Sequence, residues 1–144
     1  MTQIECELCA QQGGEVVHLA AQWHVVLVDD ADYPGFCRVI WNRHVREMTD
    51  LALAERDLLM AAVWQVEAAV RDVLQPHKVN LASLGNMTPH LHWHVIPRYD
   101  DDAQFPAPVW APAQRATAPE VLARRRDLLP TLRTAIRARM ASLI

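Results

Sequence analysis

The hydrophobic and polar positions of the chain form blocks that predict five strands. Apolar residues dominate positions 15–29 except for a break near residues 20–22, which is typical of two strands joined by a tight turn. A third apolar run occupies residues 36–41, after a turn rich in acidic residues, proline and glycine. Two more strands are expected at residues 80–84 and 90–96.

A longer segment between the third and fourth strands repeats its apolar residues with a helical period. Within residues 51–74 they recur at steps of three and four, whereas most charged residues fall elsewhere. Gln75 and Pro76 should end this helix, because a residue that precedes proline is disfavoured in the helical conformation. The stripe that we expect to face the core consists of Leu59, Ala62, Val63, Val66, Val70, Val73 and Leu74.

The last third of the chain has a different composition. Three prolines close together, at positions 106, 108 and 112, exclude regular structure there and predict an extended arm. Residues 119–144 have apolar residues at roughly helical spacing and predict two short helices, with Pro130 in the first turn of the second. We therefore expect a core domain at residues 1–100, with residues 101–144 forming an arm and helices packed on the same domain.

Length and charge narrow the classes of protein. A chain of 144 residues with 51% hydrophobic residues can bury one ordinary core. Its formal net charge of −3 gives no bulk electrostatic reason to bind nucleic acid or an anionic membrane. The sequence has no apolar run of about 18 residues and no signal-peptide pattern. We expect a cytoplasmic protein without nucleic-acid or membrane partners.

Three histidines alternate with apolar residues in the fifth predicted strand. Successive side chains of a strand point to opposite faces, so His90, His92 and His94 should share one face, about 6.6 Å apart. Leu91 and Trp93 should lie on the other face, against a core. Burying three imidazoles only for packing would require partners for six ring nitrogens, so the row indicates function.

Two kinds of chemistry use such a row, and the spacing alone does not choose between them. Alternate histidines can converge on a zinc ion. Alternatively, one imidazole attacks phosphorus while its neighbours hold charged oxygens and protonate the leaving group. The sequence contains no glycine-rich phosphate loop and no motif for an organic cofactor.

The segment HLHWHVI at residues 90–96 resembles the signature of the histidine-triad (HIT) superfamily. Asn80, Gly85 with Asn86, and VIWNRHV at residues 39–45 are similar to other segments of the family and occur in the same order. The resemblance covers residues 6–98 and points to bacterial proteins of the Hint- and Fhit-like nucleotide hydrolase type. It implies an α+β fold with a five-stranded, mainly antiparallel sheet crossed by one long helix, followed here by a C-terminal helical extension, and usually a homodimer.

The same resemblance implies an activity and assigns roles to residues. His92 would be the nucleophile of a nucleotidyl hydrolase or transferase, forming a covalent nucleotidyl-histidine at the α-phosphate of a nucleoside phosphoramidate or dinucleoside polyphosphate. His94 would contact the phosphate and the leaving group. Asn80 and Asn86 would bind near the phosphate, and Asp29 would hold the ribose hydroxyls. This chain differs from the family at two positions. The family often has serine at the position of Met87 and glutamine at the position of Asn86.

Cys6 and Cys9 form a C-x-x-C pattern near the N-terminus. With His44 and His90 they would supply two sulfurs and two imidazoles, a set that suits a closed, structural zinc site. Some bacterial histidine-triad proteins and the galactose-1-phosphate uridylyltransferases resemble this arrangement. The alternative is two ordinary cysteines in a short N-terminal helix. The third cysteine, Cys37, lies in an apolar run and should be part of the core.

Two other functions remain open at this point. One is a zinc-dependent hydrolase in which all three histidines of the row bind the metal, and the other is a nucleotide-binding protein without turnover. We also expect the arm at residues 105–110 to fold back so that Trp110 contacts a nucleotide or leaving group, of this subunit or of its partner; the alternative is that Trp110 only caps the sheet or the dimer interface. His18, His24 and His77 are expected to be structural or exposed.

Overall fold

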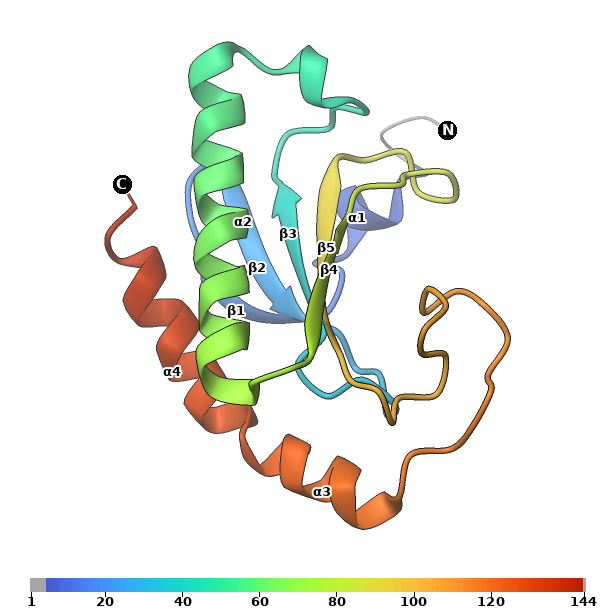
Figure 1. The fold of residues 1–144 in the computed structure, drawn as a ribbon. Coiled ribbons are helices and arrows are strands. Elements are labelled where there is room, and N and C mark those ends of the chain that lie inside the picture. Colours follow the sequence, from blue (N-terminus) through green and yellow to red (C-terminus); the bar gives the residue numbers. More distant parts are fainter. Residues whose placement is uncertain (1–4, 144) are drawn as a thin grey trace.

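The computed structural model describes residues 5–143 and has the predicted α+β architecture (Figure 1). All five strands, the long helix and the two C-terminal helices are present, together with a short N-terminal helix and a single 3-10 turn. In chain order the elements are α1 (Glu7–Ala10), β1 (Glu15–Leu19), β2 (Trp23–Leu27), β3 (Cys37–Trp41), η1 (Met48–Asp50), α2 (Leu53–Leu74), β4 (Lys78–Ala82), β5 (His92–Arg98), α3 (Pro119–Asp127) and α4 (Leu129–Met140).

The strands form one sheet in the order β1-β2-β3-β5-β4, and each neighbouring pair is antiparallel. The helix α2 lies across one face of this sheet, with α4 beside it (Figure 1). Alternate strand residues such as Val25, Val39 and Val95 are fully buried beneath α2. The stripe predicted on α2 contacts this core, and α4 adds Leu132, Ile136 and Met140.

The end of α2 agrees with the sequence. Gln75 adopts a left-handed conformation with φ 48°, and its backbone N–H donates to Arg71 O. Pro76 has no N–H and cannot continue the helical hydrogen-bond pattern. The predicted first turn of α4 also contains Pro130. No described helix combines the length and the apolar character that crossing a membrane requires.

The start of β5 differs from the prediction in a way that matters for the site. The strand begins at His92, not at residue 90, because the chain leaves a turn in which the His90 N–H donates to Thr88 O at 2.8 Å. Leu91 then bonds to Val45 and Trp41 through its backbone. The preceding strand, β4, begins and ends two residues earlier than the predicted range 80–84. His90 is therefore outside the regular row, while His92 and His94 are within it.

The arm after β5 is organised by one buried carboxylate. Asp102 accepts hydrogen bonds from Arg98 Nε at 2.8 Å, from the Tyr99 N–H at 3.0 Å and from the Phe105 N–H at 2.7 Å. Burial would raise the pKa of Asp102, but the hydrogen bonds from Arg98, Tyr99 and Tyr33 lower it to about 2. The arm has no helix or strand as far as α3, in agreement with its prolines. Asp102 thus fixes where the arm leaves the sheet.

Candidate active site and metal centre

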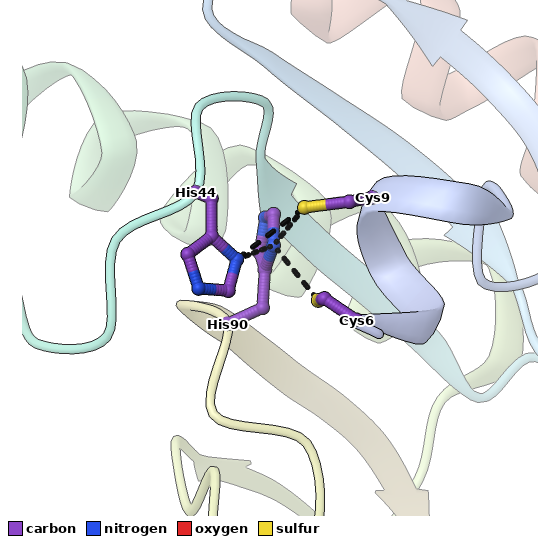
Figure 2. Close-up of side chains that lie close together, drawn as sticks. All are labelled: Cys6, Cys9, His44 and His90. Atoms are coloured by element: carbon purple, nitrogen blue, oxygen red, sulfur yellow. Dashed lines mark hydrogen bonds between the residues drawn. The ribbon is translucent and has the colours of Figure 1, made fainter. Parts of the chain in front are cut away.

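Four predicted metal ligands converge at the N-terminal end of β5 (Figure 2). Cys6 precedes α1, Cys9 lies within α1, His44 lies in the loop after β3, and His90 precedes β5. Their ligand atoms all lie within 4.8 Å of one another. Segments that are far apart in the sequence therefore meet at one possible metal site.

Four of the six distances between the ligand atoms fit a tetrahedral ion. His90 Nδ1 lies 3.5 Å from Cys6 Sγ and 3.4 Å from Cys9 Sγ, and His44 Nδ1 lies 3.3 Å from Cys9 Sγ and 3.3 Å from His90 Nδ1. Zinc bonds of about 2.0–2.3 Å in tetrahedral geometry place neighbouring ligand atoms about 3.3–3.8 Å apart. Two sulfurs and two imidazoles are a typical donor set for structural zinc.

The tautomer of His90 is set by its backbone partner. Its Nε2 lies 2.6 Å from Trp41 O, and because a carbonyl only accepts, Nε2 carries the hydrogen. Nδ1 of the neutral ring is then left with a lone pair that points at the cysteines and His44, as a metal ligand requires. His90 is 1% exposed. This histidine therefore belongs to the possible metal site and not to the row formed by His92 and His94.

The tautomer of His92 is the opposite of that of His90. Its Nδ1 lies 2.5 Å from His90 O and must donate the hydrogen to it. Nε2 therefore holds the lone pair of the neutral imidazole. Burial lowers the pKa of His92, as does the positive charge of Arg38, while the hydrogen bond to His90 opposes this. A neutral ring with one fixed tautomer is the form that can act as a nucleophile.

His94 packs against His92 and two aromatic rings. Its ring centre is 4.9 Å from that of His92, 5.6 Å from that of Phe36 and 5.4 Å from that of Trp110, each in an edge-on arrangement. Burial is the main reason that the pKa of His94 falls to about 4, and the charges of His92 and Arg38 add to it. Its Nδ1 is buried and has no hydrogen-bond partner among the described residues.

His92 and His94 open onto a cleft of about 380 Å³ between α1, the loop before β5 and the arm. Asn86 and Trp110, two residues expected at the substrate, both line this cleft. Arg38 was not anticipated, although it stands out as a charged residue within an apolar strand. The lining comprises Glu7, Arg38, Leu84, Gly85, Asn86, Met87, Thr88, His92, His94 and Trp110.

The remaining predicted residues lie apart from the cleft or at its margin. Asn80 shares the face of His94, but its Oδ1 accepts a hydrogen bond from Arg98 at 2.8 Å. Asp29 is exposed after β2 and does not appear among the described residues that line the cleft. Met87 is 91% exposed, so its thioether leaves the position of the usual serine open to solvent.

The lowered pKa of His94 makes stability depend on pH. An unfolded imidazole takes up a proton near pH 6.5, whereas native His94 does so at about pH 4. Between these values the unfolded chain binds more protons, so the free energy of unfolding should fall as the pH falls, by up to about 1.4 kcal/mol per pH unit.

Urea unfolding of the wild type and of a His94→Gln variant, measured from pH 7 to pH 4.5, isolates this contribution. The variant should lose less stability over the interval. Equal losses in the two proteins would contradict the assignment. The other histidines and the carboxylates are common to both proteins. Their contributions therefore cancel when the two slopes of unfolding free energy against pH are compared.

The fold and the site together define a histidine-triad protein: an antiparallel sheet that presents paired imidazoles in a cleft, crossed on its other face by a long helix. Residues 11–101 match the model of the HIT domain, and the chain belongs to this family.

Comparison with known proteins agrees with this assignment. The chain is 35% identical over 78 residues to an AP-4-A phosphorylase of Mycobacterium tuberculosis, a match that covers 50% of this chain and only 40% of that protein. A histidine triad protein from Bradyrhizobium japonicum superimposes with a TM-score of 0.70 at 26% identity, over 89% of this chain and 91% of that one. A Zn-bound histidine triad family protein from Mycobacterium smegmatis has a TM-score of 0.59 at 23% identity, over 93% and 99% of the two chains.

Proposed function

We propose that the chain is a nucleotidyl hydrolase or transferase that attacks the α-phosphate of a nucleotide conjugate through His92. The observation that carries this proposal is the hydrogen bond from His92 Nδ1 to His90 O. It leaves the lone pair on Nε2, for which the described residues provide no hydrogen-bond partner. The AP-4-A phosphorylase relative supports a phosphate-bridged nucleotide as one substrate class.

The reaction has two steps. In the first, the Nε2 lone pair of His92 forms a bond to the α-phosphorus, and the bond from phosphorus to the leaving group breaks with its electron pair on the leaving group. In the second, water or another acceptor forms a bond to phosphorus and releases its proton to the solvent, while the P–N bond breaks and returns its electron pair to His92. His90 O holds the Nδ1 hydrogen in both steps and stabilises the positive ring of the intermediate.

The four-residue metal site has a structural role in this proposal. A zinc ion bound there would have four protein ligands and no open position, so it would supply folding energy and not a reactive water. The zinc of the mycobacterial neighbour supports the choice of metal. A metal bound by all three histidines of the row is disfavoured, because among the described residues the cluster of possible ligands includes His90 but neither His92 nor His94.

Trp110 would form the side of the cleft that contacts the substrate. The arm places its ring 5.4 Å from His94, and the side chain is still 54% exposed. An exposed indole beside a nucleotide cleft can stack on a base, at about 1–3 kcal/mol per base. We expect Trp110→Ala to lower kcat/KM by about 10-fold, mostly through KM.

Steady-state kinetics of Trp110→Ala with an adenosine conjugate test this role. The matched control is Trp64→Ala, because Trp64 lies on α2, away from the cleft, and is 59% exposed. Unchanged kinetic constants in Trp110→Ala would assign the residue to packing.

A homodimer and a cytoplasmic location remain predictions from the sequence.

The function itself is tested by turnover. Purified protein is incubated with adenosine 5′-phosphoramidate and with diadenosine tetraphosphate, and release of the nucleotide is followed by chromatography. Hydrolysis of at least one conjugate is expected. Binding of both without turnover would favour a nucleotide-binding protein that lacks catalysis.

A further inference from the structure

We propose that Arg38 binds a phosphate of the leaving group, so that the site selects conjugates whose α-phosphate is bonded to a second phosphate over conjugates that release an uncharged amine. This inference rests on the proposed function and narrows its substrate class. It depends on where β3 places one guanidinium, how that group is held, and what charge surrounds it.

The register of the sheet puts Arg38 beside the reactive histidines. In the antiparallel pair of β3 and β5, Arg38 is directly opposite His94, and Ile40 is opposite His92. Residues paired in this way point to the same face of the sheet. Arg38 accordingly lines the same cleft as both histidines and Trp110.

The guanidinium is held in place before any substrate binds. Its Nη1 donates to Gly13 O at 2.9 Å, and its central carbon lies 5.9 Å from the centre of the Phe36 ring. Gly13 has φ +80°, a conformation that residues with a side chain rarely adopt, so the backbone at this position favours glycine. A donor fixed in this way loses little conformational entropy when it binds an anion.

Part of the hydrogen-bonding capacity of Arg38 is not used. Its Nε is buried and has no hydrogen-bond partner in the described structure. A guanidinium has five N–H donors in a planar fork that matches the oxygens of a phosphate. Because Nε is buried, an anionic ligand in the cleft would use the remaining donors of the two terminal nitrogens.

The surroundings leave the charge of Arg38 only weakly balanced. Burial lowers the pKa of Arg38 and the carboxylate of Glu7 opposes this, but the side chain stays charged as arginines do. Glu7 is exposed at the rim of the cleft, and the ion pairs of the described residues do not include Arg38. A partly buried cation that forms no ion pair with the described residues costs free energy that a bound anion would recover.

The leaving groups differ in what they need from the protein. An amine departs only if it gains a proton, whereas a phosphate departs with the electron pair of the broken P–O bond and needs its charge stabilised. Met87 is exposed in the lining of the cleft, and its thioether cannot donate a hydrogen to a leaving amine. Arg38 is the only described residue lining the cleft with a permanent positive charge, and it favours the phosphate.

The experiment compares two conjugates that give the same adenylyl-histidine. For Arg38→Gln, kcat/KM with diadenosine tetraphosphate should fall about 10- to 100-fold, the size expected for loss of one charged donor. With adenosine 5′-phosphoramidate the loss should be less than about 3-fold, because ammonia presents no second phosphate. Equal losses with the two substrates would place Arg38 on the reacting phosphate and overturn the inference.

Two further measurements cover the remaining outcomes. The control variant Arg133→Gln removes another arginine that binds a segment near the N-terminus, since Arg133 bonds to Glu15. Because Arg133 lies on α4, the variant should leave both activities unchanged. The wild type should bind ADP about 10-fold or more tightly than AMP in calorimetry, which requires neither turnover nor a folded variant. Equal affinities would overturn the inference. If wild-type protein turns over neither conjugate, the proposed function fails, and the nucleotide affinities still decide the role of Arg38.

Discussion

His92→Ala is expected to reduce turnover by about 10⁴-fold or more while the protein stays folded and still binds nucleotide. A lost donor or general acid costs about 10²- to 10⁴-fold, and loss of the attacking group removes the covalent route itself. The substitution also removes the hydrogen bond to His90 O, but the deleted ring leaves space in which a water molecule can replace the imidazole. Single-turnover kinetics with either adenosine conjugate measure the loss.

The intermediate gives a second measurement of the same prediction. Rapid quenching of the wild type should trap one nucleotide on His92, and the adduct should be lost in acid. His94→Ala should retain part of the activity, because that residue would only assist. A control variant, His18→Ala, changes a strand histidine that is not among the described residues lining the cleft and should be unaffected. Full activity of His92→Ala, or an adduct on His94, would exclude this mechanism.

Removal of zinc should produce the second large effect, on stability. Protein purified without chelators is expected to contain about one zinc per chain, and a strong chelator or Cys6→Ser should lower Tm by about 10 °C or more. The reason is that the four possible ligands come from separate segments, which a bound metal would hold together, and that Cys6 is fully buried. Elemental analysis and calorimetry measure the metal content and the Tm.

A second cysteine variant separates loss of metal from loss of a buried thiol. Cys37 is also fully buried but lies in the apolar core under α2. Cys37→Ala should lower Tm and leave the zinc content unchanged. If the purified protein contained no metal and its Tm did not respond to chelators, the proposed structural zinc site would be wrong.

The strength of each sequence signal explains which parts of the fold were predicted. The five strands and α2 follow from long, regular apolar periods, which depend on burial against one core. Strand ends were predicted less accurately, because hydrogen bonds from residues distant in sequence decide them. His90 illustrates this, since the turn at Thr88 and the carbonyl of Trp41 remove it from the strand row.

Residues of the site could be predicted where residue types with a characteristic chemistry occur at a spacing that this chemistry requires. The four possible metal ligands were expected together because few other functions use two cysteines and two histidines in that order. Arg38 could not be placed, because its position beside His94 depends on the register between β3 and β5. Asn80 was expected at the phosphate, and its hydrogen bond with Arg98 could not be anticipated from the sequence.

The walls of the cleft come from parts of the chain that are about one hundred residues apart. Glu7 belongs to α1 and Trp110 to the arm anchored by Asp102, whereas His92, His94 and Arg38 belong to the sheet between them. Mutations that reshape the arm can therefore accumulate without disturbing the core beneath the sheet face that carries the two histidines. Under the proposed function, contacts of the arm with the substrate can then change while Arg38 and the two histidines stay fixed, and engineering of new conjugate specificities should start at the arm.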